Sequence, residues 1–196
     1  MKTALVIIDL QNDFLDPRGA YARGGCANPA AQVLPERVLP LAQAVRAAGG
    51  LVVASQFTLW PGVGGAPMIS PHLLALRPFL RQGDFAPGSW GQANVDLLQP
   101  AIDATVHKVA YSAFFNTQLD WLLRKNGIER VAVCGIVTNG GVASTVRDAH
   151  MRDYDTWVVA DGCAAFKPET HATALADMAT VAHVVDSADF GARVLA

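Results

Sequence analysis

Short apolar runs rich in β-branched residues alternate along this chain with segments whose apolar positions recur at helical spacing. The apolar runs predict strands at residues 3–8, 51–55, 104–109, 130–134, 156–160 and 182–185. The segments between them predict helices at residues 33–48, 116–126, 141–153 and 169–179. Because strands that alternate with helices usually pair in parallel, the order indicates a sheet covered by helices on both faces. The expected fold class is α/β, a three-layer α/β/α Rossmann-like sandwich with a mostly parallel six-stranded sheet.

Residues 57–92 interrupt this rhythm with many Pro and Gly residues and with the aromatic residues Trp60, Phe85 and Trp90. The segment is long for a simple connection between two strands. Long ordered loops of this kind usually carry function. We therefore expect a lid over a binding site or a contact between subunits.

Length and composition limit the class of protein. The 196 residues suit a single domain, 1–196, with one core. Hydrophobic residues make up 52% and charged residues 16%, which favours a homo-oligomer, a dimer or tetramer. The net charge of -2 argues against a nucleic-acid partner. Residues 1–8 are too short an apolar run for a signal peptide or a membrane span, so we expect no membrane association and a cytoplasmic location.

The three cysteines, Cys26, Cys134 and Cys163, are odd in number and lack CxxC spacing. This argues against a disulfide framework or a zinc knuckle and agrees with a reducing cytoplasm. Cys134 ends a predicted apolar strand, so we interpret it as a small buried hydrophobic residue and not as a nucleophile.

Several polar or flexible positions follow predicted strand ends, where ligands bind in parallel sheets. Asp9 follows the run ALVII and is a candidate general acid or base, although it could instead cap the next turn. Lys108 would keep the Asp9 carboxylate ionised or orient substrate oxygens, unless it is a solvated lysine. Strand alternation places His107 on the opposite side, so we interpret it as structural or exposed. The Gly-rich bend at 135–141 would let backbone N–H groups approach developing negative charge.

Three separated motifs, TALVIIDLQNDF, HKVAYSAFFNTQLDWLLRKNGI and VAVCGIVTNGGVASTVRDA, resemble the isochorismatase-like hydrolase superfamily of cysteine hydrolases in both residues and order. The amidases of that family use an Asp, Lys, Cys triad. Asp9 and Lys108 match its first two members, but Gly141 stands at the position of the nucleophile. The resemblance also implies a non-proline cis peptide between Val137 and Thr138. It thus implies catalytic roles for Asp9 and Lys108 and a substrate-facing position for Gly141.

The resemblance also bears on the substrate pocket and on metals. Nicotinamidases of the family carry Asp-x-His after the second strand, where this chain reads SQFTLW. The histidines of this chain also lack a second metal ligand at i, i+4. We therefore expect no metal and no cofactor. Isochorismatases with Gly in place of Cys are similar in having Gln at the position of Gln56. The substrate-binding residues that we expect are Gln56, Phe14, Trp60, Trp90, Phe114, Val137, Thr138 and Gly140.

Three functions remain open, each on a small-molecule ligand. The first is isochorismatase-type hydrolysis, in which Asp9 protonates an enol-ether carbon and water attacks the resulting cation, without a cysteine nucleophile. The second is amide hydrolysis by activated water, or an amidase whose nucleophile is lost; direct attack is harder because amide carbonyls are poor electrophiles. The third is a catalytically silent binding protein on the same fold.

Overall fold

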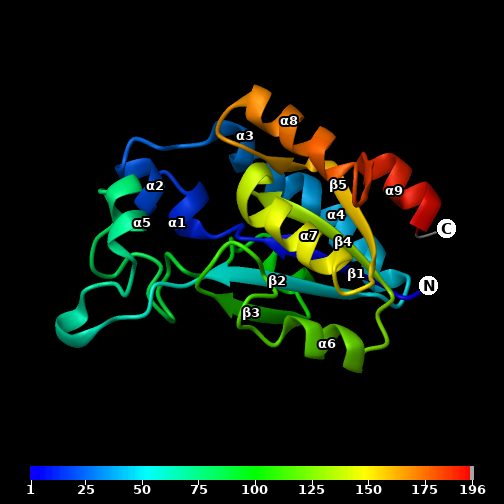
Figure 1. The fold of residues 1–196 in the computed structure, drawn as a ribbon, viewed down its shortest axis with the longest axis horizontal. Helices are drawn as coiled ribbons and strands as arrows, with labels where there is room; N and C mark the ends of the chain where they lie inside the picture. Colours follow the sequence, from blue (N-terminus) through cyan, green and yellow to red (C-terminus); the bar gives the residue numbers. More distant parts are fainter. Residues whose placement is uncertain (195–196) are drawn as a thin grey trace.

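A single parallel sheet forms the centre of the protein in a computed structural model that describes residues 1–194 (Figure 1). Its strands are β1 (Thr3–Ile8), β2 (Leu51–Phe57), β3 (Ala104–Lys108), β4 (Arg130–Ile136), β5 (Asp155–Ala164) and β6 (His183–Val185). They lie in the order β3-β2-β1-β4-β5-β6, and every neighbouring pair is parallel. The predicted α/β fold with six strands is confirmed. The direction in which successive strands are added reverses between β1 and β4.

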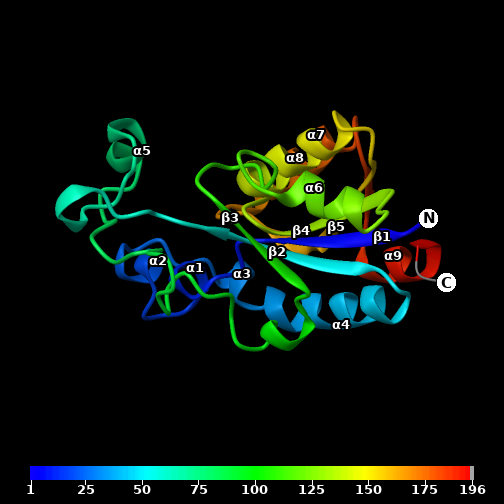
Figure 2. The ribbon, with the colours of Figure 1, turned by 90° about the horizontal axis from the view of Figure 1, so that it is seen from below.

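Helices cover both faces of this sheet (Figure 2). On one face, α4 (Leu34–Ala47) packs against β1, β2 and β5, and α9 (Ser187–Val194) contacts α4 and β5. On the opposite face lie α6 (Leu119–Lys125), α7 (Ala143–His150) and α8 (Pro168–Met178). All four predicted helices are therefore present, as α4, α6, α7 and α8. No helix within residues 1–194 has the length and apolar character needed to cross a membrane.

Two of these helices begin later than predicted, for local reasons. Asn116 has a positive φ of 52°, so it cannot be the first residue of a right-handed helix. Thr117 instead accepts a hydrogen bond from the N–H of Leu119, where α6 starts. The start of α7 is delayed because residues 138–142 form a π-helical turn.

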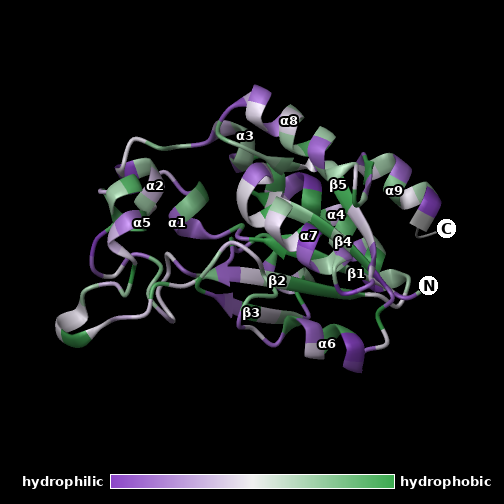
Figure 3. Cartoon of the chain, viewed as in Figure 1, coloured by the Kyte–Doolittle hydropathy of each residue, from purple (hydrophilic) through white to green (hydrophobic). Residues whose placement is uncertain are grey.

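The core explains why the strand sequences are almost continuously apolar. All six residues of β1 are buried, since α4 covers one face of the sheet and the helices around α7 cover the other. Figure 3 shows hydrophobic residues along most of β2, whereas β3, at the edge of the sheet, is largely hydrophilic. A strand with both faces covered needs an apolar residue at every position and shows no alternation.

The segment 57–92, which we call the lid segment, extends beyond the carboxyl ends of β2 and β3 (Figures 1 and 2). It contains α5 (Pro71–Leu76) and a 3₁₀ turn (Val63–Gly65). Short helices follow β1, namely α1 (Asn12–Leu15), α2 (Ala20–Arg23) and α3 (Pro29–Gln32), and a second 3₁₀ turn (Gln99–Ala101) precedes β3. A second apolar cluster joins the lid segment to α2 through Ala20, Tyr21, Leu59, Leu80 and Phe85.

A buried carboxylate reinforces this attachment. Asp13 accepts hydrogen bonds from the backbone N–H groups of Ala20, at 3.0 Å, and of Phe85, at 2.7 Å. One side chain therefore links α1, α2 and the lid segment. The lid segment is held over the edge of the sheet where the candidate site residues are expected.

Candidate active site

Asp9 and Gly141 follow β1 and β4, the two strands between which the strand order reverses. In sheets of this kind the loops after these two strands diverge to opposite faces, which leaves a crevice at their carboxyl ends. Lys108 is the last residue of β3, at the same edge of the sheet. The topology alone therefore brings these three predicted residues toward one place.

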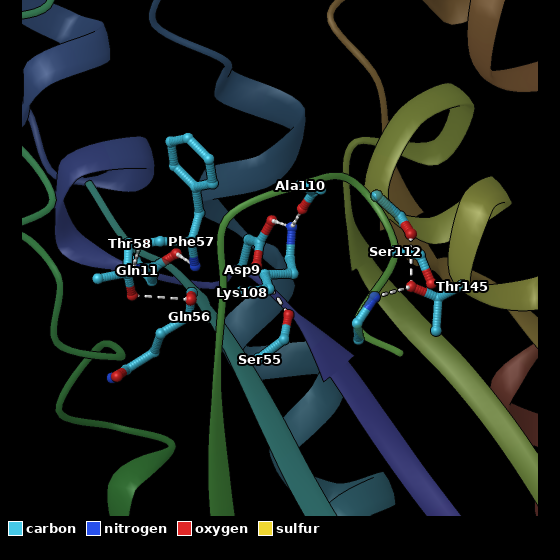
Figure 4. A network of polar contacts seen from close by, with 12 residues as sticks. Asp9, Gln11, Ser55, Gln56, Phe57, Thr58, Lys108, Ala110, Ser112 and Thr145 are labelled. Atoms are coloured by element: carbon cyan, nitrogen blue, oxygen red, sulfur yellow. Dashed lines mark hydrogen bonds and ion pairs between the residues drawn. The ribbon is translucent and has the colours of Figure 1, made fainter. Parts of the chain in front are cut away.

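Asp9 and Lys108 form a buried ion pair there. The Lys108 Nζ atom lies 2.7 Å from Oδ2 of Asp9, and their side chains are 2% and 6% exposed, respectively. The Ser55 hydroxyl donates to Oδ1 of Asp9 at 2.7 Å, and Lys108 also donates to the carbonyl oxygen of Ala110 (Figure 4). Asp9 has a positive φ of 54°, a conformation that costs on the order of 1 kcal/mol outside glycine and is concentrated at functional sites.

The surroundings of Asp9 act on its pKa in opposite directions. Burial raises the pKa above its ordinary value because the carboxylate loses its hydration. The Lys108 ammonium, the Ser55 hydroxyl and the backbone N–H of Phe57 lower the pKa, but they only partly offset burial. A carboxylate with a raised pKa is a stronger base than an ordinary aspartate. Asp9 is thus suited to accept a proton from a substrate or a water molecule.

Gly141 lies beside this pair and lines the same cavity. A Cβ atom added there would lie 3.5 Å from Oδ2 of Asp9 and 2.8 Å from Cγ2 of Ile8. The position therefore faces the carboxylate, as a nucleophile position must, but carries no side chain. The preceding bend does contain a non-proline cis peptide, between Ile136 and Val137. Our expectation of a cis bond between Val137 and Thr138 is wrong by one position, because the residue types of the bend do not distinguish neighbouring bonds.

A cavity of about 90 Å³ opens from the ion pair toward the lid segment. Its lining is mostly apolar and rich in aromatic residues. The lining residues are Asp9, Phe14, Tyr21, Phe57, Leu73, Arg77, Lys108, Val109, Ala110, Tyr111, Ile136, Val137, Gly141 and Phe166. Such a cavity, with few polar groups at defined places, is typical of a small-molecule site.

The structure brings some of the predicted residues into this cavity and leaves others outside. Asp9, Lys108, Gly141, Phe14 and Val137 belong to the lining. The predicted residues outside it are Gln56, Trp60, Trp90, Phe114, Thr138 and Gly140.

Each residue outside the lining has another environment. Trp60 and Trp90 are almost half exposed, and Arg18 stacks over the Trp90 ring. Phe114 is packed in the core beneath Arg152. The Thr138 hydroxyl lies 2.8 Å from Nδ1 of His171, so it joins the bend to α8.

Gln56 is displaced from the site by strand alternation. β2 continues to Phe57, two residues further than predicted, so Ser55 and Phe57 share one face and Gln56 lies on the other. Figure 4 shows the Gln56 side chain pointing away from the Asp9–Lys108 pair. The hydroxyl of Ser55, which the sequence analysis did not single out, takes the position beside Asp9. Extending the period-two pattern through Phe57 would have identified it.

Further lining residues were missed because they come from irregular segments. The rings of Tyr21 and Phe166 stack with centroids 5.9 Å apart, and Arg77 donates through Nε to the Tyr21 hydroxyl at 2.8 Å. Tyr111 lies in the motif after Lys108 that carries the family resemblance, which was the available signal for it. No periodic pattern singles out Tyr21, Arg77 or Phe166.

The arrangement can perform acid–base chemistry on a small molecule. It offers a buried carboxylate with a raised pKa, a lysine fixed beside it and a cavity, lined by Asp9, Lys108 and Gly141, that could hold a water molecule or a reacting carbonyl group. Within residues 1–194, no group of three or more His, Cys, Asp or Glu side chains is arranged to hold a metal ion.

Known proteins resemble this chain in sequence and in structure. The isochorismatase domain family matches residues 3–189. Ureidoacrylate amidohydrolase RutB of Methylorubrum extorquens is 36% identical over 169 residues, which cover 81% of this chain and 68% of that protein. A crystal structure of an isochorismatase family protein from Desulfovibrio vulgaris has a TM-score of 0.81 and 29% identity, over 98% of this chain and 99% of that one.

N-carbamoylsarcosine amidase from Thermoplasma acidophilum has a TM-score of 0.74 and 28% identity, over 95% of this chain and 97% of that one. The resemblance carried by the three sequence motifs is thus confirmed by a family match, by relatives in sequence and by shared architecture. This chain belongs to the isochorismatase domain family of hydrolases.

Proposed function

We propose that this protein hydrolyses the C–N bond of a small amide or ureido compound, with water as the direct nucleophile. The observation that carries the proposal is the buried Asp9–Lys108 pair beside the empty position at Gly141. The pair supplies a base and a fixed positive charge. The cavity that Gly141 lines would hold water beside Asp9, where the cysteine hydrolases have a thiol.

The relatives favour this reading over enol-ether hydrolysis, which the sequence analysis placed first. RutB is named an amidohydrolase, and structural neighbours with comparable coverage include an N-carbamoylsarcosine amidase and nicotinamidases. The geometry agrees with them, because both oxygens of Asp9 accept hydrogen bonds or ionic contacts. A carboxylate held in this way is suited to accept a proton, whereas the enol-ether mechanism needs a protonated acid.

In the proposed reaction, water attacks the carbonyl carbon while its proton passes to Oδ2 of Asp9. The new C–O bond places negative charge on the carbonyl oxygen. Backbone N–H groups of the bend before α7 would stabilise that charge. The C–N bond then breaks, and the proton held by Asp9 is delivered to the leaving nitrogen. Lys108 stays beside Asp9 and favours its ionised form between turnovers.

A panel of small amides and ureido acids, including ureidoacrylate, tests the proposal by ammonia release, with isochorismate assayed in parallel by pyruvate release. We expect ammonia release that is lost in Asp9→Asn and retained in Asp96→Asn, an exposed control. Pyruvate release that depends on Asp9, without ammonia release, would instead support the enol-ether reaction. Absence of turnover on the whole panel would favour a silent binding protein.

A further inference from the structure

Arg77 is the third ionised side chain that lines the cavity, and it has no carboxylate partner. Asp9 and Lys108 neutralise each other at 2.7 Å. Seven other arginines form ion pairs with aspartates, but within residues 1–194 no ion pair involves Arg77. The charged residues that line the cavity therefore leave one uncompensated positive charge on its lid side.

The local structure fixes Arg77 toward the cavity. Ser70 caps α5 by accepting from the N–H of Leu73, and Arg77 is the first residue after this helix. Leu73 from this helix and Arg77 directly after it both line the cavity. Phe79 packs edge-to-face against Tyr21 with centroids 5.1 Å apart, which anchors the chain just after Arg77.

The hydrogen bonds of Arg77 leave most of its donors available. Its Nε–H donates to the Tyr21 hydroxyl, a neutral acceptor, and Tyr111 lies close by. A guanidinium has five N–H donors in a planar fork that matches the two oxygens of a carboxylate. The Tyr21 hydroxyl can in turn donate its own proton to the same anion.

We propose that Arg77, with Tyr21, binds a carboxylate group of the substrate. The inference rests on the proposed function and narrows its substrate class to short acids that carry an amide or ureido group at the other end. The carboxylate lies at the lid side of the cavity, and the scissile group lies at the Asp9–Lys108 pair. Arg77 is a specificity-determining residue and takes no part in the chemical step.

Binding of ligands without a C–N bond tests this separately from catalysis. The probes are 4-oxopentanoate and the uncharged 5-hydroxypentan-2-one, with affinity measured by calorimetry. Because hydrogen bonds to charged groups are strong, the wild-type protein should prefer the carboxylate by about tenfold or more. Arg77→Gln should lose this preference and bind the neutral probe as the wild type does.

Two variants control for indirect effects. Arg77→Lys should keep part of the preference, because it retains the charge without the planar fork. Arg81→Gln removes another lid arginine that does not line the cavity, and it should bind both probes as the wild type does. Thermal melts of all variants establish that the lid segment remains folded.

The results separate this inference from the proposed function. Equal affinity for the two probes, a preference that survives in Arg77→Gln, or no binding of 4-oxopentanoate at millimolar concentration would overturn the role of Arg77. A preference that depends on Arg77, in a protein that releases no ammonia from 3-ureidopropanoate, supports the carboxylate site while counting against C–N hydrolysis. Hydrolysis of 3-ureidopropanoate with the same KM in the wild type and in Arg77→Gln would support C–N hydrolysis while counting against the carboxylate site.

Discussion

The Lys108 ammonium lies 2.7 Å from a carboxylate oxygen of Asp9, and the two side chains are almost completely buried. Removing one member of such a pair leaves the other charge in a medium that solvates it poorly. The stability of the fold at this edge of the sheet and the chemistry of the site therefore depend on the same contact.

Lys108→Met should lower the free energy of unfolding by about 3–5 kcal/mol at neutral pH, because it leaves Asp9 unpaired. The double variant Asp9→Asn/Lys108→Met should lose less than the sum of the two single losses. Urea unfolding of all four proteins measures this coupling. The exposed pair Arg124–Asp120 is the control, and Arg124→Met should change stability little. Additive losses at Asp9 and Lys108 would contradict the pairing.

The pH dependence of turnover follows from the raised pKa of Asp9. A general base must be ionised, so kcat/KM should fall as the pH falls through that pKa, at a pH above the ordinary value of 3.8. Lys108→Met and Ser55→Ala each remove a group that lowers the pKa, so each should move this fall to higher pH. Gln56→Ala should not move it, because that side chain points away from Asp9. A rate that instead rises as the pH falls would indicate a protonated Asp9.

The sequence predicted the parts of the site that follow from the strands. Asp9 and Lys108 directly follow or end buried strands, so the topology of a parallel sheet was enough to bring them together. Gln56 was misplaced because the predicted strand ended before it, whereas β2 continues to Phe57 and alternation turns Gln56 to the face opposite Ser55. Arg77 and Phe166 come from segments without periodicity, and only tertiary packing places them in the cavity.

Substitutions at Gly141 test the empty nucleophile position. Gly141→Ala should destabilise the fold by about 1–3 kcal/mol, because its Cβ would meet Cγ2 of Ile8 at 2.8 Å and the carbonyl oxygen of Ile136 at 3.0 Å. It should also slow turnover by occupying the space beside Asp9. Gly191→Ala is the control, since a Cβ there meets nothing within 4 Å, and it should not destabilise the fold. Unfolding and activity assays on both variants measure the difference.

Gly141→Cys would place a thiol beside Asp9, in the position that cysteine hydrolases use. We expect an acyl adduct with an activated ester, visible by mass spectrometry, and activity that becomes sensitive to alkylation. If the variant folds but forms no adduct and shows no change in activity, then a thiol at position 141 is not sufficient to give this site the chemistry of a cysteine amidase.

Alkylation of the native thiols should leave turnover intact, because none of the cysteines lines the cavity. Cys134 and Cys163 are buried, and loss of hydration raises the pKa of Cys163 to about 12 and that of Cys134 well above its ordinary value. Both thiols therefore stay protonated at pH 8, and only the half-buried Cys26 should react with iodoacetamide in the folded protein.

Peptide mass spectrometry identifies the modified residue. The reference is denatured protein, in which all three thiols should react. Cys26→Ser should resist modification and keep full activity. Loss of activity in step with modification of Cys134, while the protein stays folded, would identify a thiol-dependent reaction and contradict direct attack by water.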